Sequence, residues 1–206
     1  HVFGSNNSEH PGVSYLKQKV GPVYVGGSVI GVNKPTFYDF RPLRDTPNEL
    51  RKKFNELGWS RIVAFQTRNP LHRAHYELTH RASEEFQANL LIHPVVGMTK
   101  PGDIDHFTRV RCYEAILNQY PRSSTCLSLL NLAMRMAGPR EAILHGLIRA
   151  NYGCTHFIIG RDHAGPGLKS DNKPFYEPYK AQELFERFKD KININLIKFR
   201  NFVYVE

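Results

Sequence analysis

A regular alternation of strand-like and helix-like segments limits the folds open to this chain. Five short apolar runs are typical of buried strands: 61–67, 89–96, 125–130, 155–160 and 192–199. The segments between these runs repeat apolar residues at helical spacing and have helix start and stop signals. The pattern predicts a Rossmann-like α/β domain, with a doubly wound and mostly parallel sheet of about five strands and helices on both faces.

The first forty residues differ from the rest in composition, because Gly, Val, Tyr and Pro are frequent there. Within them GPVYVGGSVIGV, residues 21–32, alternates apolar and small residues, which predicts a β-hairpin with its turn at Gly26-Gly27. A helix with Thr46 as its N-cap and Pro47 at its first position follows. We therefore expect a β-rich remnant of another domain over 1–40 and the α/β domain over 41–206, with that domain cut short at its C-terminal end.

Charge and cysteine usage restrict the class of protein. The net charge of +9 favours anionic partners, but the basic residues are dispersed and form no RNP, zinc-finger or basic-zipper pattern. Small anions are therefore expected rather than nucleic acid. Three cysteines without a CxxC pair fit a reducing compartment. No apolar run reaches the ~18 residues of a membrane span, and no signal peptide is visible. A cytoplasmic protein is expected, and organellar targeting stays open because the chain begins at His1.

The stretch FQTRNPLHRAH, residues 65–75, places many polar groups directly after the first strand of the α/β domain. Asn69 before Pro70 predicts a helix that starts there, and a helix N-terminus binds anions. His72 and His75 would then lie on one helical face. Gln66, Thr67 and Arg68 add hydrogen-bond donors, and arginine binds oxyanions in a bidentate manner. Alone, this pattern is also that of an ordinary capped helix. A metal pair is disfavoured, since HExxH is absent.

A second polar loop, GRDHAGPG at residues 160–167, follows the strand at 155–160. Its glycines allow the backbone to approach a ligand closely, and Arg161 and His163 supply cationic or donor groups. Asp162 is expected to pair with Arg161 or with the loop backbone. In parallel sheets, ligands bind beyond the carboxyl ends of strands, so both loops are expected at one site. Neither loop is a Walker A or GxGxxG motif, which disfavours P-loop ATPases and hydride-transfer enzymes.

With both loops considered, the chain resembles the ATP sulfurylase (sulfate adenylyltransferase) family. The matching segments are VAFQTRNPLHRAH, LIHPVVGMTKPGDIDHFTRVR, LAMRMAGPREA and NYGCTHFIIGRDHAGPG, in the family's order from about residue 40 onward. The HxxH step is also similar to the HxGH step of the wider nucleotidylyltransferase group, with Ala74 in place of glycine. The resemblance implies that sulfate attacks the α-phosphorus of MgATP in line and that adenosine 5′-phosphosulfate and pyrophosphate form.

The resemblance also implies roles for individual residues. Gln66, Arg68 and the backbone N–H of Ala164 would bind sulfate, and His72 and His75 would stabilise the transition state around the phosphates. The active-site trio of the family corresponds to Thr67, Arg68 and Asn69. ATP would be bound by Gln66, Thr67, Arg68, Asn69, Gly160, Arg161, Asp162, His163 and Phe202, the last through its backbone. Phe199 aligns with a residue linked to substrate-dependent movement. No protein-bound metal and no tightly bound cofactor are implied beyond Mg²⁺ in MgATP.

Two other functions stay open at the level of the sequence. One is an HxGH-type nucleotidylyltransferase that uses a different acceptor, and the other is a non-catalytic module that binds nucleotide or RNA. The positive charge alone supports the second alternative. For the leading hypothesis, the partners are ATP, sulfate, adenosine 5′-phosphosulfate and pyrophosphate, without nucleic acid or membrane, and a homo-oligomer is expected.

Overall fold

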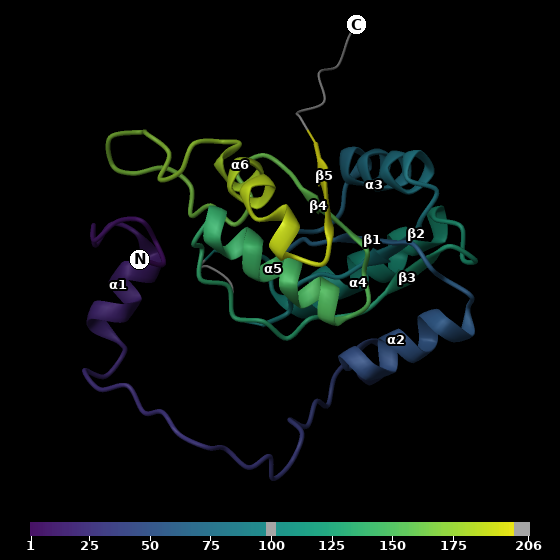
Figure 1. Cartoon of the computed structure of the whole chain (residues 1–206), viewed down its shortest axis with the longest axis horizontal. Helices are drawn as coiled ribbons and strands as arrows, with labels where there is room; N and C mark the ends of the chain where they lie inside the picture. The colour runs from purple at the N-terminus through teal and green to yellow at the C-terminus, as the bar shows by residue number, and fades with distance from the viewer. Residues whose placement is uncertain (98–101, 200–206) are drawn as a thin grey trace, which may run out of the picture.

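The five predicted strands form one parallel sheet. A computed structural model describes residues 1–97 and 102–199 of the chain (Figure 1). The strands lie in the order β3-β2-β1-β4-β5, and every neighbouring pair is parallel. Their bounds are Ile62–Phe65 (β1), Asn89–Ile92 (β2), Thr125–Leu127 (β3), His156–Ile159 (β4) and Asn195–Lys198 (β5). The expected Rossmann-like fold is confirmed, with each strand shorter than the apolar run that predicted it.

Helices cover both faces of this sheet. Their bounds are Pro11–Gln18 (α1), Pro47–Glu56 (α2), Arg73–Glu85 (α3), His106–Ile116 (α4), Pro139–Asn151 (α5) and Lys180–Arg187 (α6), with short 3-10 helices at Arg41–Leu43, Leu117–Gln119 and Lys189–Lys191. Helices α2, α5 and α6 contribute to the hydrophobic core on one face, and α3 and α4 to the core on the other. No helix of the described ranges is long and apolar enough to cross a membrane.

Burial on both faces explains why the strands are continuous apolar runs rather than alternating ones. In β1, Ile62 and Ala64 belong to the core beside α2, α5 and α6, whereas Val63 and Phe65 belong to the core beside α3 and α4. All four side chains are buried. A strand covered on both sides has no solvent face, and its sequence therefore needs no polar positions.

Local signals mark the starts of three helices, among them the predicted start at Thr46-Pro47. At α2, Thr46 Oγ1 accepts a hydrogen bond from the Glu49 N–H at 3.4 Å, and the Thr46 N–H donates to Glu49 Oε2 at 2.7 Å. At α4, Asp105 Oδ1 accepts from the Thr108 N–H at 2.9 Å. Helix α5 begins with Pro139. These caps satisfy N–H groups that have no partner within the helix, so they act through neighbouring residues alone.

The hairpin expected at residues 21–32 is wrong, because the first forty residues contain no strand. This segment is extended and runs outside the body of the α/β domain, as Figure 1 shows. Its apolar side chains are exposed, with 97% of Val25, 93% of Val29 and 90% of Ile30 accessible. A two-stranded hairpin is marginal unless another element covers its apolar face, and no described element covers this one.

Helix α1, which the sequence did not suggest, is tied to the α/β domain through His10. This imidazole is fully buried, and its Nδ1 accepts from the Gly12 N–H at 3.0 Å. Its Nε2 lies 2.9 Å from the hydroxyl of Tyr176, in the loop before α6. Phe3, Val13 and Ala137 form a small apolar cluster beside it. Residues 1–18 therefore pack on the α/β domain rather than stand apart from it.

The order of the strands places the two polar loops next to each other. It runs from β1 through β2 to β3 on one side and from β4 to β5 on the other, so it reverses between β1 and β4. Connections from β1 and β4 leave to opposite faces at such a switch point, and this opens a crevice at the carboxyl ends of the two strands. Residues 66–69 leave β1 at this position, and residues 160–165 leave β4.

We predict that Gly146 is required where α5 packs on α6. A Cβ at this position would lie 2.5 Å from Phe185 Cε2, and the Phe185 side chain is fully buried. Gly146→Val should lower the free energy of unfolding by about 2 kcal/mol, since overpacking a well-filled core costs this much. Urea denaturation measures the effect. Leu147→Ala, at a half-exposed neighbour on α5, is the control and should change stability by less than about 1 kcal/mol. An unchanged midpoint for Gly146→Val would contradict the packing described.

Candidate active site

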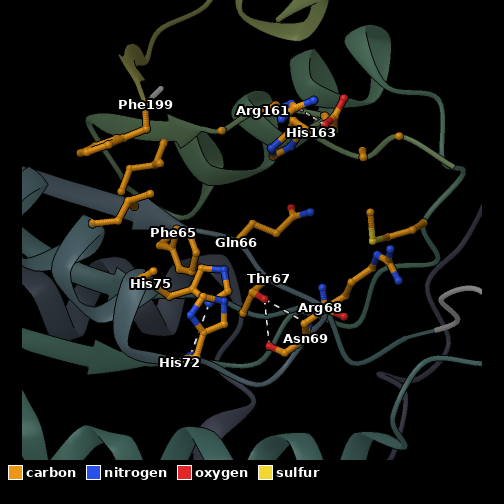
Figure 2. Close-up of a pocket in the computed structure, with 18 residues that line it drawn as sticks. Phe65, Gln66, Thr67, Arg68, Asn69, His72, His75, Arg161, His163 and Phe199 are labelled. Atoms are coloured by element: carbon orange, nitrogen blue, oxygen red, sulfur yellow. Dashed lines mark hydrogen bonds and ion pairs between the residues drawn. The ribbon is translucent and has the colours of Figure 1, made fainter. Parts of the chain in front are cut away.

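A cavity of about 460 Å³ lies at the carboxyl ends of β1 and β4. Figure 2 shows its lining residues from both loops facing a common space. The residues that sequence reasoning singled out and that line it are Gln66, Thr67, Arg68, Asn69, His72, His75, Gly160, Arg161, Asp162, His163 and Ala164. Phe202 lies outside the described residues. Two segments about ninety positions apart in the sequence thus form one site.

Further lining residues were not assigned to the site from the sequence. They are mostly apolar: Phe65, Leu78, Met134, Ile158 and Gly165. Ala74, which stands in place of the HxGH glycine, also lines the cavity. Phe199, which the resemblance linked to movement, also lines the cavity. Strand periodicity marked Phe65 and Ile158 as core residues, and nothing in their local pattern separates a cavity wall from a core. Met134 lies in the segment LAMRMAGPREA, so the resemblance of that segment to the family was the signal that could have indicated its place at the site.

The loop after β1 is held from behind by helix α4. Arg109, only 2% exposed, donates through Nη1 to the backbone oxygens of Arg68 and Val95, both at 2.9 Å. The hydroxyl of Tyr113 donates to the backbone oxygen of Asn69 at 2.9 Å. Burial raises the pKa of Tyr113 to about 12, so this hydroxyl stays protonated and can donate. These two side chains fix the backbone of the loop, and no local pattern in the sequence indicated either role.

Helix α3 begins later than the sequence predicted. Asn69 is not its N-cap, since the N-cap is His72 and the helix starts at Arg73. The backbone oxygen of Asn69 accepts from the Thr67 hydroxyl and from Tyr113, both at 2.9 Å. It is therefore not the acceptor of a first helical hydrogen bond. The His72 oxygen has that function, accepting from the N–H groups of His75 at 2.9 Å and Tyr76 at 3.1 Å.

His72 and His75 nevertheless come together at the cavity, with ring centroids 3.9 Å apart. The His72 N–H donates to Nδ1 of His75 at 3.4 Å. A neutral His75 must then keep its proton on Nε2, which makes Nε2–H a hydrogen-bond donor. Burial, followed by the charge of His72, lowers the pKa of His75 from 6.5 to about 4. At neutral pH, His75 is therefore an uncharged donor at the cavity.

Arg68 forms an ion pair with Asp103, and both side chains are largely buried. Asp103 lies between the second strand and α4, and the sequence did not indicate it. The ion pair holds the guanidinium in one orientation and leaves further N–H groups for a ligand, because arginine has five donors.

The Oε1 atom of Gln66 is buried and has no hydrogen-bond partner among the described residues. This oxygen is therefore available to accept a hydrogen bond from a ligand.

The loop after β4 adopts a strained backbone at two non-glycine residues. Asp162 has φ 52° and Ala164 has φ 54°, both in the left-handed region. Hydrogen bonds hold this conformation: the Asp162 N–H donates to the oxygen of Pro178 at 2.8 Å, and the Gly138 N–H donates to the oxygen of Ala164 at 3.1 Å. Such strain persists only where the surroundings enforce it, and it is frequent at functional sites.

The polar side chains that line the cavity are mainly cationic groups and neutral donors. The carboxylate of Asp162 lies 3.0 Å from Nε of Arg161, as the sequence predicted. No group of three or more His, Cys, Asp or Glu residues that could hold a metal ion occurs within the described ranges. Such a donor set suits polyanions, whose charge it balances, better than a bare cation.

Comparisons with known proteins agree on one family. The ATP-sulfurylase family model matches residues 41–206. A sulfate adenylyltransferase of Aspergillus oryzae is 58% identical over 204 residues, which are 99% of this chain and 35% of that protein. The corresponding protein of Mycosarcoma maydis is 55% identical over 204 residues, which cover 99% of this chain and 36% of its own length. The chain thus spans about a third of the length of these curated relatives.

Among solved structures, the chain is similar to one described as a hexameric APS kinase from Thiobacillus denitrificans. The two share 37% sequence identity with a TM-score of 0.67. The match covers 84% of this chain and 31% of that one.

We predict that His75 is neutral at pH 7 and titrates near pH 4. In the unfolded chain this histidine is protonated below about pH 6.5, whereas in the folded chain it stays neutral down to about pH 4. The contribution of His75 to stability is therefore complete above that pH and is lost as the pH falls toward 4. Pyrophosphate in the cavity should raise this pKa, because an anion favours the charged ring. NMR titration of the His75 ring signal, assigned with a His75→Gln variant, measures both. A midpoint near 6.5 without ligand would contradict this prediction.

Proposed function

Since the chain belongs to the ATP-sulfurylase family, we propose that it contains a sulfate adenylyltransferase active site. The reaction transfers the adenylyl group of MgATP to sulfate, and adenosine 5′-phosphosulfate and pyrophosphate form. The observation that supports this best is the convergence of Gln66–Asn69, His72, His75 and Gly160–Ala164 on one cavity. Its Arg and His side chains suit two anions that must be held together.

Sulfate is a poor nucleophile and is repelled by the phosphates it attacks. The protein therefore has to place the two anions in line and neutralise the charge that builds up. Gln66 and Arg68, with the backbone N–H of Ala164, would hold sulfate. Arg68 is suited to this because Asp103 already orients its guanidinium. The left-handed conformation of Ala164 is held by its hydrogen bond to Gly138 and would direct its N–H.

The phosphates of ATP would lie toward α3 and Arg161. His75 offers Nε2–H without a permanent charge, and Asn69 and His72 lie beside it. As charge moves onto the leaving pyrophosphate, a donor fixed beforehand stabilises the transition state more than the ground state. Thr67 contributes through the loop backbone, since its hydroxyl bonds Asn69. Attack is direct, and no covalent enzyme intermediate is proposed.

Magnesium would enter as part of the substrate MgATP and be held mainly by phosphate oxygens. Among the described lining residues, Asp162 supplies the one carboxylate, and it is paired with Arg161. This pairing supports a metal bound by substrate rather than by a protein cluster. No tightly bound cofactor is proposed.

The organisation of the protein follows the same reasoning. The family model begins at residue 41, which supports an α/β domain over 41–206. The exposed apolar residues of 21–32 support a contact with a further part of the protein, consistent with residues 1–40 being the tail of another domain. A homo-oligomer is proposed because a related structure is described as hexameric. Three free cysteines support a reducing, cytoplasmic location.

The activity is tested by sulfate-dependent release of pyrophosphate from MgATP, and by ATP formation in reverse, on the longest natural polypeptide that contains this chain. His75→Ala should lower turnover about 100- to 1000-fold, because it removes a transition-state donor. His80→Ala, on the same helix but outside the cavity lining, is the matched control and should keep turnover near normal. Adenylyl transfer to a phosphate ester and not to sulfate would instead favour another acceptor.

Sulfate binding provides a separate prediction. Arg68→Gln should raise the KM for sulfate about 10- to 100-fold, since a charge-assisted hydrogen bond contributes this much. Its effect on the KM for ATP should be smaller. Arg122→Gln removes the same charge at an exposed position and should leave both constants unchanged. Equal effects of Arg68→Gln on the two substrates would contradict the assignment of Arg68 to sulfate.

A further inference from the structure

Behind the cavity, His163 is linked to a buried histidine and a buried glutamate that sequence reasoning did not single out. Nε2 of His163 lies 3.0 Å from Nδ1 of His145, on α5. The His145 side chain is fully buried, and its other nitrogen, Nε2, faces Oε1 of Glu141 at 3.5 Å. No group within the described ranges approaches this nitrogen at ordinary hydrogen-bond distance. The three side chains form a row from the first turn of α5 to the cavity wall.

Glu141 is held as a carboxylate at the end of this row. Its Oε1 accepts from the Arg135 N–H at 2.7 Å, and its Oε2 accepts from the Ala137 N–H at 2.9 Å. Burial pushes the pKa of Glu141 up, but the interactions with His145 and these two backbone donors outweigh it and keep the pKa below its usual value. An ionised carboxylate accepts hydrogen bonds and cannot donate one.

Both histidines of the row are neutral near pH 7. Burial is the first cause that lowers the pKa of His145, although Glu141 opposes it, and the cation Arg149 lowers it further. Burial, then His145 and Arg149, lower the pKa of His163 well below its ordinary value. Each ring therefore has one N–H and one lone pair, and their arrangement along the row decides what His163 offers to a ligand.

The carboxylate allows one favourable arrangement. With a lone pair on Nε2, His145 would face the negative oxygen of Glu141, and that contact is repulsive. The proton of His145 therefore lies on Nε2, which leaves the lone pair on Nδ1. Nε2 of His163 must then donate to it across the 3.0 Å contact. The remaining nitrogen of His163, Nδ1, keeps its lone pair and has no hydrogen bond within the described part of the chain.

We propose that Glu141 and His145 are positioning residues that keep His163 in the Nε2–H tautomer, so that its Nδ1 accepts a hydrogen bond from a donor group of the nucleotide. This inference rests on the proposed function, because it names the part of ATP that His163 meets. A lone pair repels phosphate oxygens, so the donor belongs to the nucleoside, as a ribose hydroxyl or the adenine amino group. His163 thus differs from His75, whose Nε2–H suits phosphate.

The tautomers are measured directly by NMR of the protein with ¹⁵N-labelled histidine. Signals are assigned with His145→Gln and His163→Gln variants. The two tautomers have distinct ¹⁵N shifts, so the spectrum shows which nitrogen is protonated. The expected pattern is Nε2–H for both rings, unchanged between pH 6 and 8. A proton on Nδ1 of His163, or a charged ring at pH 7, would overturn the proposal. This measurement needs neither turnover nor a variant of Glu141, so it stands apart from the test of the proposed function.

Nucleotide analogues identify the donor. The expected result is a KM about 10-fold or more higher for one of 2′-deoxy-ATP, 3′-deoxy-ATP and inosine triphosphate, since an unpaired buried acceptor carries this cost. The two deoxy analogues report on the ribose and the inosine analogue on the amino group. Unaffected binding of all three would overturn the proposal, whereas failure of ATP itself to bind would count against the proposed function instead.

Glu141→Gln tests the role of the carboxylate. The neutral amide removes the negative charge that holds the proton on Nε2 of His145, so the opposite tautomer of both rings becomes populated and Nδ1 of His163 then carries a proton. The KM for ATP should rise several-fold, while the KM for sulfate should not change. The penalty for the sensitive analogue should become smaller, since non-additive effects show that two groups act together. Glu141→Asp keeps the charge and should keep the analogue penalty. A folded Glu141→Gln variant that discriminates as the parent does would contradict the role of Glu141.

Discussion

The parallel pairing of β1 with β4 is the constraint on which the rest of the site depends. Val63 lies opposite His156 and Ala64 opposite Phe157, so the two strands end at the same edge of the sheet. Both strands are buried on both faces, so a slip of register by one residue would move side chains that fit one core into the other. This pairing brings the loops at 66–69 and 160–165 to one cavity.

Charge in the cavity is organised by neighbouring side chains. Asp103 orients Arg68, and Asp162 lies against Arg161. Arg109 and Tyr113 hold the backbone of the first loop from α4. Burial keeps His75 neutral, so that its ring is a hydrogen-bond donor without a positive charge. Groups held in place beforehand need not reorganise when charge develops nearby.

Sequence reasoning succeeded where a signal and its structural effect lie within a few residues. Thr46 and Asp105 mark helix starts because a cap bonds to an N–H group three positions away, and Pro139 marks one because it suits the first helical position. It failed where the local structure depends on contacts with residues far away in the sequence. The start of α3 moved from Asn69 to His72 because Tyr113 takes the carbonyl of Asn69. The hairpin at 21–32 did not form because its alternating pattern has no described surface to cover.

The sequence by itself determined the class of fold and the two polar loops that line the cavity, since both follow from local periodicity and from polar residues directly after apolar runs. It also supplied the resemblance from which sulfate and ATP were inferred. Only the tertiary structure decided which groups orient those loops. Asp103, Arg109, Glu141 and His145 act through contacts whose geometry is set when separate elements pack. Hydrogen bonds depend on distance and angle between atoms, and sequence separation does not specify either.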